Sequence, residues 1–252
     1  VVTFYGLIRE KQFFHKVVME YVDGGTLSDF LGDPNNRASF QDRLGWLIQI
    51  ARGVNYLHSN DILHLDIKPH NIVLEVSQDG TVTLKLIDIS DVRPLGLTSF
   101  GTPNYMAPKR YRPSDGSLSH RDDIWAFCMT TVHILDGREP FAGIKDTMEI
   151  FRQLSRDDYE FAFSTPPSNS GSLKSAIFSL LAEFMKPSFN GTFVHILQFL
   201  MELYEQRQYF ELAVADESLL VEEKMAVAVA DESIMDDIVH DMKQLEVANR
   251  LL

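Results

Sequence analysis

The sequence predicts a chain of the α+β class, with short strands near its start and helices through most of the remainder. Residues 1–8 and 16–22 are rich in β-branched and aromatic residues, which is typical of strands. Residues 40–58 form the clearest helix, because their apolar side chains recur at helical spacing on one face. A short helix capped by Thr26 is expected at 26–31, and a second strand pair at 71–74 and 81–87, with a turn at 78–80. Four later helices are expected at 120–135, 147–154, 173–185 and 192–203.

Composition excludes several classes of protein. The chain has 252 residues, of which 45% are hydrophobic, enough for a sizeable core. A net charge of −13 argues against sequence-independent binding of nucleic acid or an anionic membrane. No apolar run is long enough for a membrane span, and no basic region leads into an apolar one at the N-terminus, so no signal peptide is expected. The single cysteine, Cys128, fits a reducing compartment. The expected location is the cytoplasm, with the nucleus as an alternative.

The densest group of reactive side chains lies in the segment 64–71, His-Leu-Asp-Ile-Lys-Pro-His-Asn. Apolar runs at 54–63 and 72–76 flank it, so a polar loop is expected between two core elements, as in many catalytic loops. An isolated His-x-Asp is common in ordinary loops, so further landmarks are needed. Three follow in order: Ile87-Asp88 at the end of an apolar strand, Gly-Thr-Pro-Asn-Tyr-Met-Ala-Pro at 101–108, and Asp-Ile-Trp-Ala-Phe at 123–127.

These four landmarks, in this order, resemble the protein kinase family over roughly residues 1–202. The resemblance implies a two-lobed α+β fold with a small β lobe, a mostly helical large lobe and a helical tail at 203–252. Lys68 and the Gly-Thr-Pro-Asn-Tyr segment resemble the serine/threonine kinases rather than the tyrosine kinases. The expected function is therefore transfer of the γ-phosphoryl group of ATP to serine or threonine hydroxyls of a protein substrate.

The resemblance also implies a role for each residue of the site. Asp66 would accept the proton of the substrate hydroxyl, and Lys68 would bind the transferring phosphate. Asn71 and Asp88 would bind Mg²⁺, and Thr102 would bridge Asp66 and Lys68.

ATP would lie against the segment 19–22, which resembles the kinase hinge. Met19 stands in the gatekeeper position, and the backbone of Glu20 and Val22 would face adenine. Val73 matches the family position that packs under the adenine ring, although a single valine is more often an ordinary core residue.

Several positions depart from the family pattern. The chain begins at the family's fourth strand, without the glycine-rich loop, the strand-three lysine and helix C. Leu65 replaces an arginine that binds the phosphorylated activation loop, and Ile89 and Ser90 replace the Phe and Gly of Asp-Phe-Gly. Lys109 and Asn190 stand where the family has a buried Glu–Arg pair, so both ends of that ion pair are expected to be absent together.

Two other functions remain open at this point. The departures suit a pseudokinase, a scaffold that signals by contact without transferring phosphate. Residues 203–252, with 12 acidic and 4 basic side chains, could instead act as an acidic helical adaptor. In this tail the hexapeptide Ala-Val-Ala-Asp-Glu-Ser occurs at 213–218 and at 228–233, and an amphipathic stripe follows that could bind a helical partner.

Overall fold

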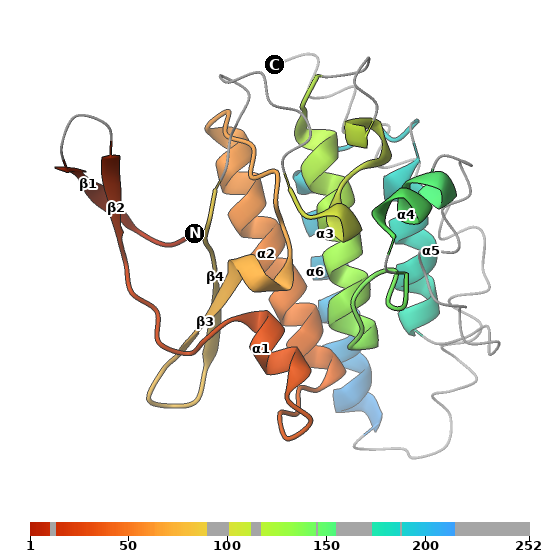
Figure 1. The fold of residues 1–252 in the computed structure, drawn as a ribbon. Coiled ribbons are helices and arrows are strands. Elements are labelled where there is room, and N and C mark those ends of the chain that lie inside the picture. Colours follow the sequence, from red (N-terminus) through yellow and green to blue (C-terminus); the bar gives the residue numbers. More distant parts are fainter. Residues whose placement is uncertain are drawn as a thin grey trace, which may run out of the picture.

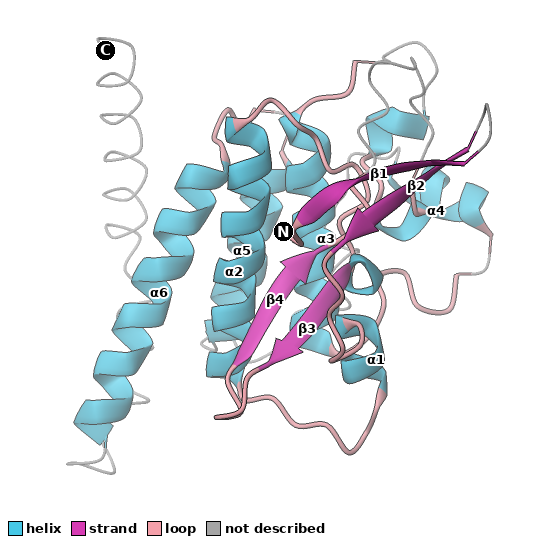
Figure 2. Ribbon diagram, turned by 90° about the vertical axis from the view of Figure 1, so that its left-hand side faces the viewer, coloured by secondary structure: helices cyan, strands magenta, loops and turns pink. Residues whose placement is uncertain are grey.

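The computed structural model describes residues 1–10, 14–89, 101–111, 117–144, 146–154, 173–186 and 188–214. It confirms the expected α+β fold, with small sheets on one side and helices on the other (Figure 1). Figure 2 shows the two strand pairs lying one after the other in front of the helices. In the part of the chain that the structure describes, no helix is both long and apolar enough to cross a membrane.

The strands form two separate antiparallel pairs. β1 (Phe4–Glu10) pairs with β2 (Phe14–Met19), and β3 (Ile72–Val76) pairs with β4 (Val82–Leu86). The first pair is tied to the second by the N–H of Val2, which donates to the carbonyl of Leu86 at 3.0 Å. All four strands were expected, within a few residues at each end.

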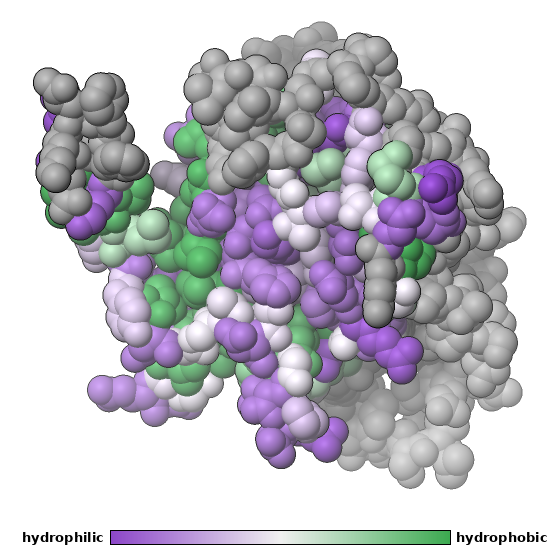
Figure 3. All heavy atoms as spheres, in the orientation of Figure 1, coloured by the Kyte–Doolittle hydropathy of each residue, from purple (hydrophilic) through white to green (hydrophobic). Residues whose placement is uncertain are grey.

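The β1–β2 hairpin exposes apolar side chains on both faces, and Figure 3 shows hydrophobic residues gathered there, on the left of the molecule. The exposed apolar residues are Phe4, Leu7, Ile8, Val17, Val18 and Met19. A two-stranded hairpin is marginally stable by itself. The fold therefore depends mainly on the other elements.

Two helices form the centre of the core. α2 (Phe40–Ser59) buries one face, and α3 (His120–Asp136) is buried along almost its whole length. The remaining helices are α1 (Leu27–Gly32), α4 (Thr147–Leu154), α5 (Leu173–Met185) and α6 (Phe193–Val214). Reciprocal hydrogen bonds fix the starts of α1 and α2. The hydroxyls of Thr26 and Ser39 accept from the backbone N–H groups of Asp29 and Asp42, whose carboxylates accept from the backbone N–H groups of Thr26 and Ser39.

Helix α6 is longer than expected. It was predicted to end at Leu203 but continues to Val214, so the expected boundary between kinase-like domain and tail falls inside a continuous helix. The repeated hexapeptide and the amphipathic stripe lie almost entirely beyond Val214, outside the described residues. The division at 202/203 stays a prediction.

The connection from β2 to α1 crosses β3 closely. The N–H of Leu74 donates to the carbonyl of Gly25 at 3.0 Å, and Thr26 forms a β-bridge with Val73. A Cβ atom at Gly24 would lie 2.1 Å from the carbonyl oxygen of Leu74, far inside van der Waals contact with backbone that cannot swing away. Only glycine fits here, so this contact fixes the segment that resembles the hinge.

Gly24→Ala should lower the free energy of unfolding by roughly 1 to 3 kcal/mol, because the added methyl group forces β3 and the connection from β2 to α1 apart. Gly32→Ala is the matched control, since nothing lies within 4 Å of the added Cβ and the residue ends α1. That control should leave stability unchanged or raise it by up to about 1 kcal/mol. Urea unfolding of both variants measures the difference, and equal midpoints would refute the close contact.

Candidate active site

The side chains of the polar loop converge on the carboxylate of Asp66. Its Oδ1 accepts hydrogen bonds from the backbone N–H of Thr102 at 3.0 Å and from the Thr102 hydroxyl at 2.9 Å. Its Oδ2 lies 2.8 Å from the amide nitrogen of Asn71 and 2.7 Å from the ammonium of Lys68. The ammonium also donates to the Thr102 hydroxyl. The structure thus brings together all four residues predicted to be catalytic.

These contacts determine the charge of Asp66. Partial burial favours the neutral acid, but hydrogen bonds from Lys68, Thr102 and Asn71 outweigh it and hold the pKa of Asp66 below its usual value. Asp66 is therefore a carboxylate at neutral pH. A carboxylate beside a lysine can accept a proton while the ammonium binds an anionic group.

The two expected magnesium ligands lie at the same end of the β3–β4 pair. Asn71 precedes β3, Asp88 follows β4, and the N–H of Ile87 donates to the carbonyl of Asn71 at 3.0 Å. The amide nitrogen of Asn71 faces Asp66, so its amide oxygen is the atom suited to a cation. Amide and carboxylate oxygens are ligands that Mg²⁺ prefers, so the donor set fits this metal.

The residues expected to bind adenine lie around the end of β2. Met19 is its last residue and is exposed, and Val22 is half-buried. The carboxylate of Glu20 accepts from the N–H of Thr3 at 3.0 Å and pairs with Lys85, and these hydrogen bonds, the one from Lys85 foremost, lower the pKa of Glu20 to about 2. Val73 lies on β3 and forms a β-bridge with Thr26, four residues after the hinge-like segment.

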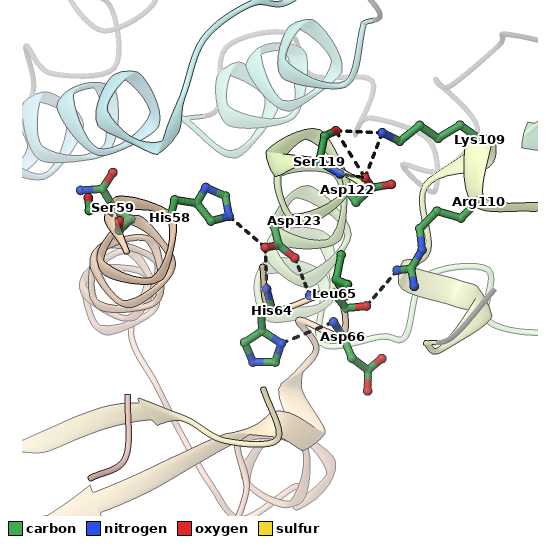
Figure 4. Close-up of polar contacts among 11 residues, drawn as sticks. His58, Ser59, His64, Leu65, Asp66, Lys109, Arg110, Ser119, Asp122 and Asp123 are labelled. Carbon is green, nitrogen blue, oxygen red and sulfur yellow. Dashed lines mark hydrogen bonds and ion pairs between the residues drawn. The ribbon is translucent and has the colours of Figure 1, made fainter. Parts of the chain in front are cut away.

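A single buried aspartate on α3 holds the loop in place (Figure 4). Asp123 Oδ2 accepts from the backbone N–H of His64 at 2.8 Å, and Oδ1 accepts from that of Leu65 at 2.7 Å. His58, at the end of α2, places its Nε2 2.9 Å from Oδ2. Asp123 therefore joins α2, α3 and the loop that carries Asp66.

Sequence reasoning recognised Asp123 only as part of a landmark and gave it no role. A signal was present, because Asp123 lies in the first turn of a long apolar helix. A carboxylate buried there without partners would be very costly, so hydrogen-bond donors could have been expected around it.

Comparison with known proteins decides the family. The model of the protein kinase domain matches residues 1–198. The chain belongs to the protein kinase family. Its relatives are serine/threonine kinases, which include myosin light chain kinase 3 of Rattus norvegicus, 35% identical over 164 residues, and serine/threonine-protein kinase DCLK1 of the same species, 37% identical over 150 residues.

A third relative, the smooth-muscle myosin light chain kinase of Gallus gallus, is 31% identical over 183 residues. The matches cover 62%, 58% and 70% of this chain, respectively. They cover only 20%, 34% and 9% of the relatives themselves. The chain thus corresponds to a small part of each of these longer kinases.

Lys109, which stands where the family has the glutamate of its buried Glu–Arg pair, makes contacts that the sequence did not predict. It binds the buried carboxylate of Asp122 at 2.9 Å and the hydroxyl of Ser119 at 2.9 Å. Arg121, which immediately precedes Asp122 on α3, donates to the carbonyls of Phe184 at 3.1 Å and Phe189 at 2.8 Å. The start of α3 therefore anchors both the segment after Ala107-Pro108 and the loop after α5.

Lys109→Glu should lower the free energy of unfolding by roughly 1 to 3 kcal/mol, because it breaks this pair and adds a second carboxylate beside Asp122. Combining it with Asp122→Asn should remove the repulsion, so a double-mutant cycle should give a coupling energy above about 0.5 kcal/mol. Lys186→Glu, beside the exposed Glu183, is the surface control and should change stability by less than about 1 kcal/mol. Additive effects in the cycle would show that Lys109 and Asp122 do not interact.

Proposed function

We propose that this chain transfers the γ-phosphoryl group of ATP to serine or threonine hydroxyls of a protein substrate. One observation carries the proposal: the carboxylate of Asp66 is held ionised by Lys68, Thr102 and Asn71, in the loop that matches the catalytic loop of the family. The names of the relatives, myosin light chain kinases and a serine/threonine-protein kinase, support the same substrate class.

The proposed roles follow from the contacts. As the substrate oxygen bonds to the γ-phosphorus and the bond to the bridging oxygen breaks, the hydroxyl proton passes to Asp66 and ADP leaves. Lys68, already 2.7 Å from Asp66, binds the transferring phosphate. Thr102 keeps Asp66 and Lys68 aligned by contacting both. Positioning of this kind supplies much of the catalysis in phosphoryl transfer.

Nucleotide binding is assigned to two groups of residues. The backbone of Glu20 and Val22, with the side chains of Met19 and Val73, would contact adenine. Asn71 and Asp88 would hold Mg²⁺, whose charge stabilises the phosphates during transfer.

A second candidate is a binding module that keeps the kinase fold and signals by contact. The observation that favours it is the set of departures from the family pattern at Leu65, Ile89, Ser90 and Lys109. An adaptor function of residues 203–252 depends mostly on residues beyond Val214, outside those described, and stays a prediction.

Asp66→Asn should reduce phosphate transfer by about 100-fold or more, because the base is lost while the shape of the loop is kept. Binding of Mg-ATP, measured by calorimetry, should stay within about threefold, since Asp66 contacts neither adenine nor the metal in this mechanism. Transfer from radiolabelled ATP to a mixture of serine- and threonine-containing peptides is the activity assay.

Glu202→Gln, an exposed carboxylate on α6, is the control and should leave both quantities unchanged. Equal turnover by the Asp66→Asn variant would remove Asp66 from the mechanism. A native chain that binds Mg-ATP and transfers no phosphate would instead favour the contact module.

A further inference from the structure

A buried arginine lies beneath the catalytic loop, and neither the family landmarks nor the proposed mechanism uses it. Arg110 belongs to the short 3₁₀ helix η4 (Pro108–Tyr111), and only 5% of its surface is exposed. Its Nη1 donates to the backbone carbonyl of Leu65 at 2.8 Å (Figure 4). A buried cation is costly unless other groups compensate its charge, so the surroundings of this guanidinium indicate what it does.

The carbonyl that Arg110 binds belongs to a strained residue. Leu65 has a φ of 66°, in the left-handed region that residues other than glycine, asparagine and aspartate rarely adopt. Its N–H donates to Asp123 at 2.7 Å, and its carbonyl accepts from Arg110 at 2.8 Å. An anion on one side and a cation on the other thus hold this conformation, as expected where strain is kept at a functional site.

The same carbonyl belongs to the peptide group that joins Leu65 to Asp66. Fixing that peptide plane fixes the positions of the Asp66 nitrogen and Cα, the atoms from which its side chain leaves the backbone, because the peptide group is planar. Arg110 therefore acts on the proposed base through the backbone, by its hydrogen bond to the carbonyl of Leu65.

Arg110 also packs against the segment that supplies Thr102. A Cβ atom at Gly101 would lie 3.2 Å from the Leu65 carbonyl oxygen and 3.3 Å from Nη1 of Arg110. Gly101, with a φ of 132°, immediately precedes Thr102, whose N–H and hydroxyl both donate to Asp66. The guanidinium of Arg110 thus binds the catalytic loop at Leu65 and packs beside Gly101, in the segment whose Thr102 binds Asp66.

Carboxylates near Arg110 compensate part of the cost of burying its charge. Burial is the largest effect and lowers the pKa of Arg110, while the charges of Asp122, Asp123 and Asp66 act in the opposite direction. The sequence places Leu65 where most kinases carry a loop arginine. Here a buried cation reaches the same residue from the segment 108–111 instead.

We propose that Arg110 is a positioning residue for Asp66: its guanidinium fixes the Leu65–Asp66 peptide and so sets the proposed base for phosphate transfer. The catalytic half of this inference rests on the proposed kinase activity, whereas the structural half does not. Both can be measured on the same variants of the full chain.

The test compares Arg110→Met, which removes the charge and the donors, with Arg110→Lys, which keeps the charge but not the planar fork. Arg152→Met, at an exposed arginine of α4, is the control. In Arg110→Met, kcat should fall roughly 100-fold, as for a misplaced catalytic group, while the KM for ATP and the Kd of Mg-ATP change less than threefold. Arg110→Lys should recover part of the loss, and the control should match the native chain.

The structural half has a readout that needs no activity. Labelling with ¹³C at leucine carbonyls and ¹⁵N at aspartate amides gives NMR signals only from Leu–Asp pairs, and the chain has two, at 65–66 and 135–136. Loss of the Arg110 hydrogen bond should move the carbonyl signal of Leu65 and leave that of Leu135 in place, which also shows that the variant is folded. If Arg110→Met does not fold, Arg110→Lys gives the same readout.

The outcomes separate the two proposals. An unmoved Leu65 signal, or a kcat equal to that of the native chain, overturns the positioning role. Equal loss of kcat and of nucleotide binding in both Arg110 variants also overturns it, because that pattern indicates general destabilisation. A native chain without transfer removes the proposed function alone, and the Leu65 signal then still decides whether Arg110 fixes the loop.

Discussion

The site depends on one buried carboxylate. Asp123, within the first turn of α3, accepts hydrogen bonds from two consecutive backbone N–H groups of the loop and lies against the imidazole of His58 on α2. Hydrogen bonds to a buried charge are among the stronger ones in proteins, and leaving such a charge unpaired costs several kcal/mol. The loop that carries Asp66 is thus attached to α3, which is buried along almost its whole length. Everything proposed for Asp66, Lys68 and Asn71 assumes that this attachment holds.

Three cationic side chains near Asp123 bind groups on other segments of the chain. Lys109 binds Asp122, Arg110 binds the carbonyl of Leu65, and Arg121 binds the carbonyls of the loop after α5. Each arginine or lysine here reaches a group that is distant in sequence and partly or fully buried. The kinase fold is retained although Leu65, Lys109 and Asn190 all depart from the family pattern. Buried charges tolerate such exchange when every charge keeps a partner.

The sequence was sufficient for the elements and for the residues around Asp66. Helix periodicity placed α2, and an apolar run with the landmark at 123–127 placed α3, each within a residue or two. The short spacing from Asp66 to Asn71 kept their side chains within reach of one another. The end of α6 was missed, because the expected boundary rested on the extent of a family match and not on a helix-stop signal. A helix continues where no glycine or proline interrupts it, and none occurs between Thr192 and Val214.

The roles of Asp123 and Arg110 could not be predicted from the sequence, because each acts on backbone groups far away in the chain. Asp123 binds an N–H group 59 residues before it, and Arg110 binds a carbonyl 45 residues before it. Side chains that bind backbone atoms leave no pattern in the partner's residue type. Only the folded chain shows that the backbone of Leu65 is bound on both sides, through its N–H group and its carbonyl.

The most direct measurement is native-state hydrogen exchange at the amides of His64 and Leu65, in the native chain and in Asp123→Asn. The amide group of asparagine offers one acceptor where the carboxylate offers two, so both donors cannot stay bonded. Exchange at these two amides should become about 100-fold faster, which corresponds to a local loss of about 2.7 kcal/mol, while the amides of α2 remain protected. Unchanged exchange at both amides would show that Asp123 does not hold the catalytic loop, and would contradict the structural basis proposed for the site.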